Sequence, residues 1–455
     1  MHLARVTSLA LYRGHRYPAP TLNIATAMPR LLYTIAYTLL LPVILLRLLW
    51  RSRLAPAYRR RWPERFGVFP APDFDHNNPV IWLHAVSVGE TLAAVPLIKR
   101  LQLEHPDWQW IITTTTPTGS ERVRATFGNR VYHVYAPYDL PVFLAAFLKR
   151  IRPALCIIME TELWPNMLHS CCIRKIPVVI ANARLSEKSA RGYKKLSPLT
   201  HGMMADVCMI AAQQQADGNR FIDLGLKQEK LAVTGSIKFD LDLDNDILSK
   251  AAVLRSQWSF AETRKVFLAA STHPGEDEII LHTFSTLKKQ FPDLLLVLVP
   301  RHPERFSTVA AQCEQAGWRV VKRSMNTAIN QETDIVIGDT MGELLAFYGA
   351  ADIAFVGGSL VPVGGHNLIE PAAWACPVIS GPYLFNFSEV ARLLQENRAL
   401  AIAQNTDELT ATIGKWLSDE AQRKNSGDRA KEVAESNRGA LQKLCSLIAE
   451  IKKAA

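Results

Sequence analysis

The sequence of 455 residues predicts an α/β protein in which two doubly wound, Rossmann-like domains follow an apolar helix near the N-terminus. Three observations lead to this prediction. Short apolar runs alternate with amphipathic stretches in two successive series, and an uncharged segment fills most of residues 31–50. The length also exceeds the roughly 250–300 residues that one hydrophobic core holds. Parallel strands need helical crossovers, so the alternation indicates parallel sheets.

The positive charge is concentrated at the N-terminal end. Residues 1–66 contain eleven arginines, one acid (Glu64) and no lysine, and the rest of the chain carries 41 basic and 41 acidic residues. A nucleic-acid-binding protein would place its positive charge on the folded domain. The net charge of +10 therefore indicates membrane association, and we expect no nucleic-acid partner.

Residues 31–50 form the predicted membrane anchor. They carry no charge before Arg47, and twenty helical residues at about 1.5 Å each span the roughly 30 Å of a bilayer core. Pro42 should kink the helix, so a shallow monotopic insertion and a buried core helix remain alternatives to a true span. Seven arginines from Arg47 to Arg65 favour a cytoplasmic location for the downstream chain and should attract anionic lipid headgroups.

Apolar runs rich in β-branched residues mark the strands of both domains. The first series is 79–84, 108–114, 131–135, 154–159 and 177–181, and the second is 265–270, 294–299, 334–338, 352–356 and 377–380. Helices should begin near Gly89, Gly119, Asp139 and Asn166. We expect the two domains to face each other across a cleft, with ligands at the carboxyl ends of the strands.

On this basis the chain divides into seven parts. They are an N-terminal extension (1–30, with Met1 or Met28 as its start), the anchor (31–50), a basic juxtamembrane segment (51–78), a first Rossmann-like domain (79–239), an acidic and polar linker (240–262), a second Rossmann-like domain (263–418) and a tail that is helical throughout (419–455).

The first chemistry-bearing motif is HAVSVGE, His84 to Glu90, which closes the first predicted strand. Ser87 and Gly89 allow a tight turn, and Glu90 follows in the first turn of the next helix. A carboxylate at this position either caps the helix dipole or acts as a general base that takes a proton from an acceptor hydroxyl. The motif alone leaves both interpretations open.

Two further strand ends in the first half carry charges. METELWPN places Glu160 and Glu162 after the fourth strand, where they either line a polar cleft or cap the next helix. The stretch from Asn182 to Tyr193 concentrates cations that begin with Arg184. These cations either meet an anionic acceptor or form a solvated helix face.

In the second half, two strand ends suit a phosphate-bearing ligand. Pro300 and Arg301 end a strand, and a guanidinium matches phosphate or carboxylate in shape. GDTMGEL places Met341, Gly342 and Glu343 at a strand-to-helix turn.

The stretch FVGGSLVPVGGHNLIEPAAWACPVISGP is the richest segment. Its glycines permit close backbone approach, and a helix that begins at Asn367 and ends near Trp374 should offer backbone amides to a phosphate. Glu370, one turn into that helix, can accept a hydrogen bond from a ribose.

No metal site is predicted. The seven cysteines form no CxxC pair and indicate buried, reduced thiols. DLDLDND, residues 240–246, imitates a metal-binding aspartate motif. It lacks the glycine and the distal glutamate of a calcium loop, so we interpret it as part of a solvated linker.

Together these motifs resemble those of the 3-deoxy-D-manno-octulosonic acid (Kdo) transferase family. The resemblance rests on SVGE, TPTGSERV, METELWPN, IANARLS, VPRHPERF, GDTMGEL, FVGGSL and GGHNLIEPAAWACPVISGP, in this order, and it runs from about Leu31 to the C-terminus. It implies a GT-B fold, CMP-Kdo as donor, and a lipid A precursor (lipid IVA) as acceptor in lipopolysaccharide core biosynthesis. It also implies inverting transfer without metal or cofactor, at the inner membrane, with the catalytic domains on the cytoplasmic side.

The resemblance assigns roles by matching motif. It implies that 79–239 binds the acceptor and 263–418 the CMP-sugar, and that Glu90 is the catalytic base. The CMP-binding residues that it implies are Pro300, Arg301, Met341, Gly342, Glu343, Asn367, Leu368, Ile369 and Glu370. Residues implied for the cleft or the acceptor are Glu160, Glu162, Arg184, Lys238 and His366.

Two other functions fit parts of the pattern. One is another membrane-associated sugar-nucleotide enzyme of the same fold, such as a lipid-disaccharide synthase or an epimerase, although an epimerase needs no membrane anchor. The other is a membrane-tethered binding protein without catalysis.

Overall fold

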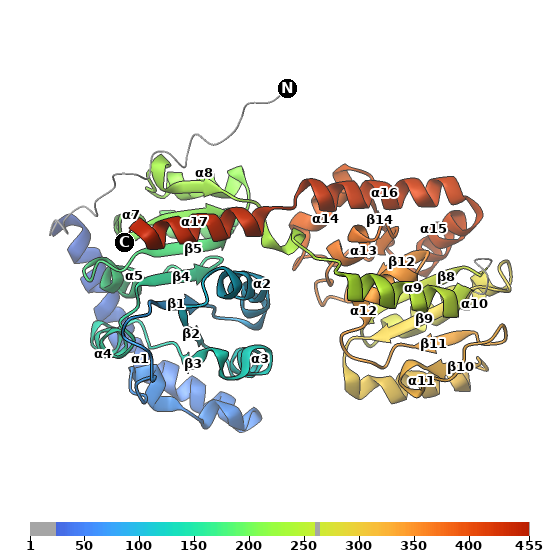
Figure 1. Ribbon diagram of the computed structural model, residues 1–455, viewed down its shortest axis with the longest axis horizontal. Helices are drawn as coiled ribbons and strands as arrows, with labels where there is room; N and C mark the ends of the chain where they lie inside the picture. Colours follow the sequence, from blue (N-terminus) through green and yellow to red (C-terminus); the bar gives the residue numbers. More distant parts are fainter. Residues whose placement is uncertain (1–23, 260–263, 455) are drawn as a thin grey trace. The chain divides into compact units, whose positions relative to one another are not determined.

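The computed structural model describes residues 24–259 and 264–454. Most of the expected extension, with Met1, therefore lies outside the described residues, as does the end of the 240–262 segment. The chain forms two compact units (Figure 1). Unit 1 contains the chain up to Asp240 together with the residues from Gly439 onward, and unit 2 contains Leu241–Arg438.

Unit 1 is built on a parallel seven-stranded sheet of order β3-β2-β1-β4-β5-β6-β7. This order starts in the middle and runs outward in both directions, as in a doubly wound fold. The strands are β1 (Val80–His84), β2 (Gln109–Thr114), β3 (Tyr132–Tyr135), β4 (Leu155–Met159), β5 (Val178–Ala183), β6 (Met209–Ala212) and β7 (Leu231–Val233).

Helices cover both faces of this sheet because side chains alternate along each strand. Ile81 and Leu83 pack toward α2, α3 and α17, whereas Val80 and Trp82 pack toward α4, α5, α7 and α8. The helices of unit 1 that follow β1 are α2 (Val88–Glu104), α3 (Pro117–Phe127), α4 (Pro141–Ile151), α5 (Pro165–Cys172), α6 (Glu187–Lys194), α7 (Ser197–Asp206), α8 (Gln215–Asp223) and α17 (Ala440–Ala454).

The C-terminal tail is divided between the two units, which corrects the expected single tail at 419–455. Helix α16 (Glu420–Ser436) belongs to unit 2, whereas α17 returns to unit 1 and buries Leu444 and Ile448 beside β5 (Figure 1). The Asp240 carboxylate accepts hydrogen bonds from the Gly439 and Leu441 backbone amides, both at 2.6 Å. A carboxylate at a helix N-terminus satisfies amides that have no partner within the helix.

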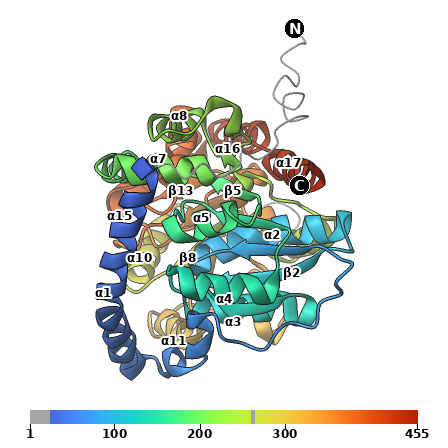
Figure 2. The same cartoon turned by 90° about the vertical axis from the view of Figure 1, so that its left-hand side faces the viewer.

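The anchor segment is one long helix, α1 (Ile24–Leu54), which continues through Pro42. Its stretch Ala27–Arg53 is long and apolar enough to cross a membrane, with a mean hydropathy of 2.0. Half-buried positions nevertheless recur every three or four residues along α1, and the helix lies against α5 and α7 of unit 1 (Figure 2). Thr34 Oγ1 lies 3.0 Å from Asn166 Nδ2, and Arg59 Nε donates to Ser52 Oγ at 3.0 Å.

Two of the seven arginines expected to meet lipid are bound within unit 1 instead. Arg65 is 5% exposed, donates to the Thr115 carbonyl and lies over the ring of Tyr135. Arg61 donates to Ser120 Oγ and to the His133 carbonyl. These two guanidiniums hold the 51–78 segment on the sheet and are not available to headgroups. The remaining five arginines of the run are exposed: Arg47, Arg51, Arg53, Arg59 and Arg60.

Unit 2 repeats the architecture with a second parallel sheet of order β10-β11-β9-β8-β12-β13-β14. Its strands are β8 (Val266–Thr272), β9 (Leu295–Pro300), β10 (Val320–Lys322), β11 (Ile335–Ile337), β12 (Ile353–Val356), β13 (Val378–Ser380) and β14 (Leu400–Ile402). Its helices are α9 (Asn245–Ser259), α10 (Glu276–Lys288), α11 (Phe306–Gln315), α12 (Leu344–Ala350), α13 (Ile369–Ala373), α14 (Ser388–Glu396), α15 (Thr406–Ser418) and α16.

The expected linker at 240–262 is mostly helix. Helix α9 packs against α12, and its Trp258 is 0% exposed, so this segment is part of unit 2 rather than a solvated connection. Most polar residues of α9 lie on its exposed face. They made the segment resemble a linker, so the apolar face of the helix was not recognised from the sequence. Strands β6, β7, β10 and β14, of three or four residues each, were also not predicted.

Glycine has opposite roles in two neighbouring helices of unit 2. A Cβ at Gly427 in α16 would collide with the Ala375 carbonyl, whereas a Cβ at Gly414 in α15 would meet only Leu287 Cδ2 at 3.5 Å. We expect Gly427→Ala to lower the free energy of unfolding by at least about 1–3 kcal/mol. Gly414→Ala should raise it by about 0.5–1 kcal/mol, since alanine favours helix. Equilibrium denaturation would measure both, and equal stabilities would contradict the packing.

Candidate functional site

The charged residues of unit 1 lie at the point where the strand order of its sheet reverses, between β1 and β4. We call this place the reversal point of the sheet. In a doubly wound sheet the loops after the two central strands run to opposite faces and leave a crevice at their carboxyl ends. In unit 1 these strands are β1 and β4, which are paired. Glu90 follows β1, and Glu160 and Glu162 follow β4. The fold therefore brings Glu90 close to two acids that are distant from it in sequence.

Glu90 and Ser87 are hydrogen-bonded to each other at the start of α2. Ser87 is the N-cap of α2, and its Oγ accepts from the Glu90 amide at 3.2 Å. In return the Glu90 carboxylate accepts from Ser87 Oγ and from the Val86 amide, both at 2.8 Å. The capping geometry raised as an alternative is thus present, and it fixes where the carboxylate points.

The surroundings of Glu90 change its acidity. The residue is 9% exposed, and burial raises the pKa of its carboxyl to about 7. The two hydrogen bonds oppose this rise, and the negative charges of Glu162 and Glu160 add to it. A carboxyl with this pKa exchanges protons near neutral pH, as a general base must.

The neighbouring acids are not equivalent. Burial raises the pKa of Glu162, whose Oε2 accepts from the Trp164 indole at 2.8 Å. Glu160 has a backbone φ of 57° and lies 3.8 Å from Lys238 Nζ. The structure therefore brings four of the predicted residues together in unit 1: Glu90, Glu160, Glu162 and Lys238.

Arg184 interacts with residues other than the three acids at the reversal point. It lies after β5, its carbonyl accepts a hydrogen bond from Thr161 Oγ1, and its positive charge acts on Asp217. The cations that follow it in α6 are exposed, which is compatible with both interpretations of this stretch.

Buried polar groups support this end of the sheet. His84 at the end of β1 is 0% exposed, shares a 2.9 Å hydrogen bond with Thr113 Oγ1, and has a pKa lowered to about 4 by burial. Helix α4 begins at Pro141, close to Asp139 as expected. The Asp139 carboxylate caps α5 by accepting from the Asn166 and Met167 amides at 3.0 and 2.7 Å.

In unit 2 the reversal point lies between β8 and β12, and a buried glutamate organises it. Glu276 is 0% exposed, in the first turn of α10. Its carboxylate accepts four backbone N–H groups, those of His273, Gly358, Ser359 and Leu360, at 2.7–2.9 Å. One side chain therefore holds the loops after both central strands.

Glycine is required where these loops approach each other. A Cβ at Gly357 would come within 2.6 Å of the Ser271 carbonyl, and one at Gly358 within 3.1 Å of the His366 ring. Gly358 also has a φ of 67°, which L side chains rarely adopt. The glycine-rich segment thus serves close backbone packing, as its composition indicated.

Arg301 and His366 meet at this edge. Arg301 follows Pro300, the last residue of β9, and its backbone amide donates to the Thr272 carbonyl at 3.0 Å. Burial lowers the pKa of His366 to about 4, and the charge of Arg301 acts in the same direction. His366 therefore lies close to Arg301 within unit 2.

The segment from Asn367 to Glu370 is shorter and more self-contained than expected. Helix α13 begins at Ile369, with Leu368 as its N-cap, and the Ile369 amide donates to Asn367 Oδ1 at 3.1 Å. Asn367 Nδ2 in turn donates to Glu370 Oε1 at 3.1 Å. Burial raises the pKa of Glu370, and Arg301 opposes the rise, so the two side chains are near each other.

The third predicted donor segment forms an exposed turn before α12. Met341 is 68% exposed, Gly342 has a φ of 87°, and Glu343 is the N-cap of α12. The Glu343 carboxylate accepts from Arg323 Nη2 at 2.9 Å and from Thr340 Oγ1 at 2.5 Å.

Among the described residues, no group of histidine, cysteine, aspartate or glutamate side chains is arranged to hold a metal ion. The aspartates of DLDLDND have separate tasks. Asp240 caps α17, Asp244 accepts from the Ile247 amide at the start of α9, and Asp246 pairs with Lys250.

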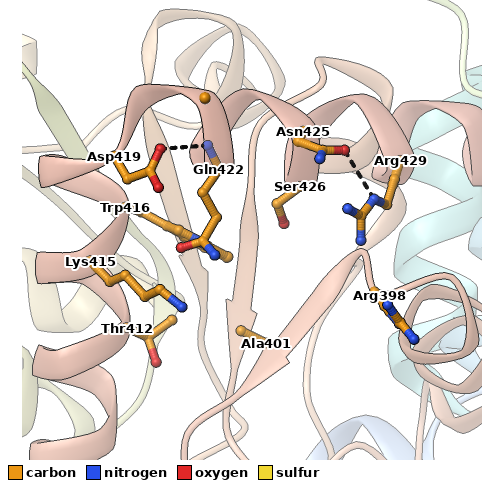
Figure 3. Close-up of a pocket in the computed structure, with 11 residues that line it drawn as sticks. Arg398, Ala401, Thr412, Lys415, Trp416, Asp419, Gln422, Asn425, Ser426 and Arg429 are labelled. Carbon is orange, nitrogen blue, oxygen red and sulfur yellow. Dashed lines mark hydrogen bonds between the residues drawn. The ribbon is translucent and has the colours of Figure 1, made fainter.

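A pocket of about 480 Å³ lies elsewhere in unit 2, between α15, α16 and β14 (Figure 3). None of the predicted site residues lines it. Its polar groups serve the helices: Asp419 caps α16 through the Gln422 amide, and Asn425 accepts from Arg429 (Figure 3).

Sequence reasoning missed Glu276 and His273. Both lie in STHPGEDE, residues 271–278, which follows β8 as HAVSVGE follows β1. In each motif a Gly-Glu pair stands at the start of the next helix: Gly89 with Glu90, and Gly275 with Glu276. That repetition was the available signal.

Two Rossmann-like units in one chain, each with polar residues at its reversal point, define the architecture of GT-B glycosyltransferases. Solved structures agree. A glycosyltransferase from Rickettsia africae aligns with a TM-score of 0.53 at 14% identity, over 83% of this chain and 98% of that one. A UDP-GlcNAc 2-epimerase from Neisseria meningitidis aligns with a TM-score of 0.51 at 13% identity, over 80% and 100%. Because both kinds of enzyme share it, the fold alone does not decide the activity.

Sequence comparison does decide it. The family model described as 3-deoxy-D-manno-octulosonic-acid transferase matches residues 60–241, and that of glycosyl transferases group 1 matches 255–433. A 3-deoxy-D-manno-octulosonic acid transferase from Haemophilus influenzae is 44% identical over 92% of this chain and 98% of its own length. One from Bordetella pertussis is 36% identical over 80% and 86%. The chain belongs to the Kdo transferase family and is a glycosyltransferase that transfers Kdo.

The role assigned to Glu276 can be tested against a neighbour in the same helical turn. Glu276→Gln places an amide NH₂ against backbone N–H groups that now donate to a carboxylate, so we expect the free energy of unfolding to fall by at least about 2 kcal/mol. Glu278→Gln, at an exposed position of α10, should change it by less than about 0.5 kcal/mol. Urea denaturation checks both, and similar midpoints for the two variants would show that the four bonds are not needed.

Proposed function

We propose that the protein moves Kdo from CMP-Kdo to a hydroxyl of a lipid A precursor (lipid IVA) in lipopolysaccharide core biosynthesis, with inversion and with Glu90 as general base. The observation that carries the proposal is the Glu90 carboxyl at the reversal point of unit 1, with its pKa raised to about 7. Membership of the family supports the sugar, and the substrates follow from it as expectations.

In this mechanism unit 1 binds the acceptor. The Glu90 carboxylate, which Ser87 and Val86 hold in place, takes the proton of the attacking sugar hydroxyl. Lys238 beside Glu160 supplies a cation for an anionic group of either substrate. Burial raises the pKa of Glu90, and the charges of Glu162 and Glu160 add to this rise. Inversion follows if the hydroxyl attacks the face opposite to the leaving nucleotide.

Unit 2 would bind the donor. We assign CMP to the segments at Pro300 and Arg301, Met341–Glu343 and Asn367–Glu370. Arg301 is exposed at the end of β9, where its guanidinium can stabilise the charge that develops on the leaving phosphate. Since a cytidine monophosphate is a good leaving group, this stabilisation needs no divalent ion, and we propose that transfer uses neither metal nor cofactor.

Transfer activity and pH test the role of Glu90. The base must be ionised, so the rate of the wild-type enzyme should fall about tenfold for each pH unit below about 7. Glu90→Gln should lower the rate by about 10²–10⁴-fold while CMP still binds. Glu104→Gln, in the exposed last turn of α2, is the matched control and should be unaffected.

The assay is incubation with CMP-Kdo, lipid A precursor and excess chelator, followed by mass spectrometry of the lipid. Undiminished transfer by Glu90→Gln would eliminate this residue as the base. Loss of transfer in the presence of chelator would eliminate the metal-independent mechanism. A wild-type enzyme that altered CMP-Kdo without a lipid product would favour another sugar-nucleotide enzyme.

We further propose that the protein is bound to the inner membrane through α1, with both units on the cytoplasmic side. The outer face of α1 exposes large apolar side chains, such as Leu39 at 74% and Leu46 at 65%. The opposite face packs against α5 and α7, and Thr34 Oγ1 lies 3.0 Å from Asn166 Nδ2 of α5. A helix with one face packed on unit 1 and the other face exposed favours insertion in the plane of the interface over a full span.

Cysteine labelling distinguishes the two modes. In intact spheroplasts, Met28→Cys at the start of α1 should stay unlabelled by an impermeant maleimide if the helix lies on the cytoplasmic face. A transmembrane span would expose it. Leu103→Cys, 81% exposed on α2, is the cytoplasmic control, and both should label after permeabilisation.

A further inference from the structure

Two histidines of unit 2 meet head to head at the reversal point of its sheet. His273 lies in the loop after β8, and His366 lies just before Asn367. Their Nε2 atoms are 2.9 Å apart, their ring centroids are 5.1 Å apart, and their planes differ by 12°. These values place the rings end to end, so the N–H of one ring points at the lone pair of the other.

Such a bond requires one proton between the two nitrogens, because two N–H groups facing each other at this distance would repel. The surroundings keep the rings from taking up further protons. Burial lowers the pKa of both histidines, and the charge of Arg301 acts on both in the same direction. For His273 the carboxylate of Glu276 opposes this effect, whereas Arg305 and His302 add to it.

The histidine pair completes a chain of contacts that starts at Glu276. The Glu276 carboxylate holds the backbone amides of His273 and Gly358. The Gly358 carbonyl then accepts from the amides of Gly364 and Gly365, at 3.1 and 2.7 Å. The segment that enters Asn367–Glu370 is therefore attached at two points, by its backbone to Gly358 and by the His366 ring to His273.

We propose that His273 is a positioning residue for the donor nucleotide, which acts through its hydrogen bond to His366 and holds the Asn367–Glu370 segment in its binding conformation. The inference rests on the proposed function, because it takes this segment to bind CMP. His273 does not itself need to touch the nucleotide.

The test compares two replacements of opposite character in the full-length protein. His273→Gln keeps a side-chain amide that can bond His366, although it loses the ring. His273→Phe keeps the ring and loses the bond. We expect His273→Phe to weaken CMP binding about tenfold by calorimetry and to raise the donor KM more than it lowers kcat. His273→Gln should stay within about threefold of wild type. His282→Phe, at an exposed position of α10, should match wild type.

Hydrogen–deuterium exchange of residues 364–370 in the nucleotide-free proteins separates this inference from the donor assignment. Exchange should rise in His273→Phe and not in His273→Gln, with the rest of unit 2 unchanged as the check of folding. Equal exchange in both variants, or a phenylalanine variant that binds CMP better than the glutamine variant, would overturn the inference. If exchange of residues 364–370 rises only in His273→Phe, but the wild-type protein does not bind CMP, the donor assignment is overturned and not this inference.

Discussion

Both units depend on a carboxylate in the first helical turn after their first strand. The amides at a helix N-terminus have no partner within the helix, so a buried carboxylate there is stabilised by the amides that it satisfies. Glu90 and Glu276 occupy this position in the two units, each after a glycine. In each unit the loop beyond the first strand donates hydrogen bonds to that carboxylate, and in unit 2 the same carboxylate also binds the loop after β12.

The two glutamates differ in the number of hydrogen bonds that their carboxylates accept, and this difference distinguishes a structural carboxylate from one suited to proton transfer. Glu276 accepts four backbone N–H groups and is shut away from solvent. Glu90 accepts one backbone N–H and one hydroxyl from the described residues, in a site that also contains two acids. Burial without full compensation raises the pKa of Glu90 to about 7, which suits a base at neutral pH. The same residue type in the same fold position thus supports a loop in one unit and proton transfer, as we propose, in the other.

A carboxylate at a helix N-terminus also joins the two ends of the connection between the units. The chain leaves unit 1 after Asp240 and returns to it at Gly439, and the Asp240 carboxylate bonds the returning segment directly. Helix α17 then fills part of the core on one face of the first sheet. Unit 1 is therefore complete only when the chain has finished unit 2, so deletions at the C-terminus remove core side chains of unit 1.

The sequence by itself determined the fold class, the long apolar helix near the N-terminus, the family and most of the strands. Apolar β-branched runs, a 20-residue uncharged segment and ordered motifs are local signals that need no knowledge of distant contacts. Only the tertiary structure decided which of those residues meet. The edge strands β10 and β14 are only partly buried and therefore carry too little apolar pattern, and the polar face of α9 imitated a linker. The buried roles of Arg65 and Glu276, and the bond between His273 and His366, join segments far apart in the chain. No local pattern encodes such pairs, because each partner is chosen by the packing of the sheet between them.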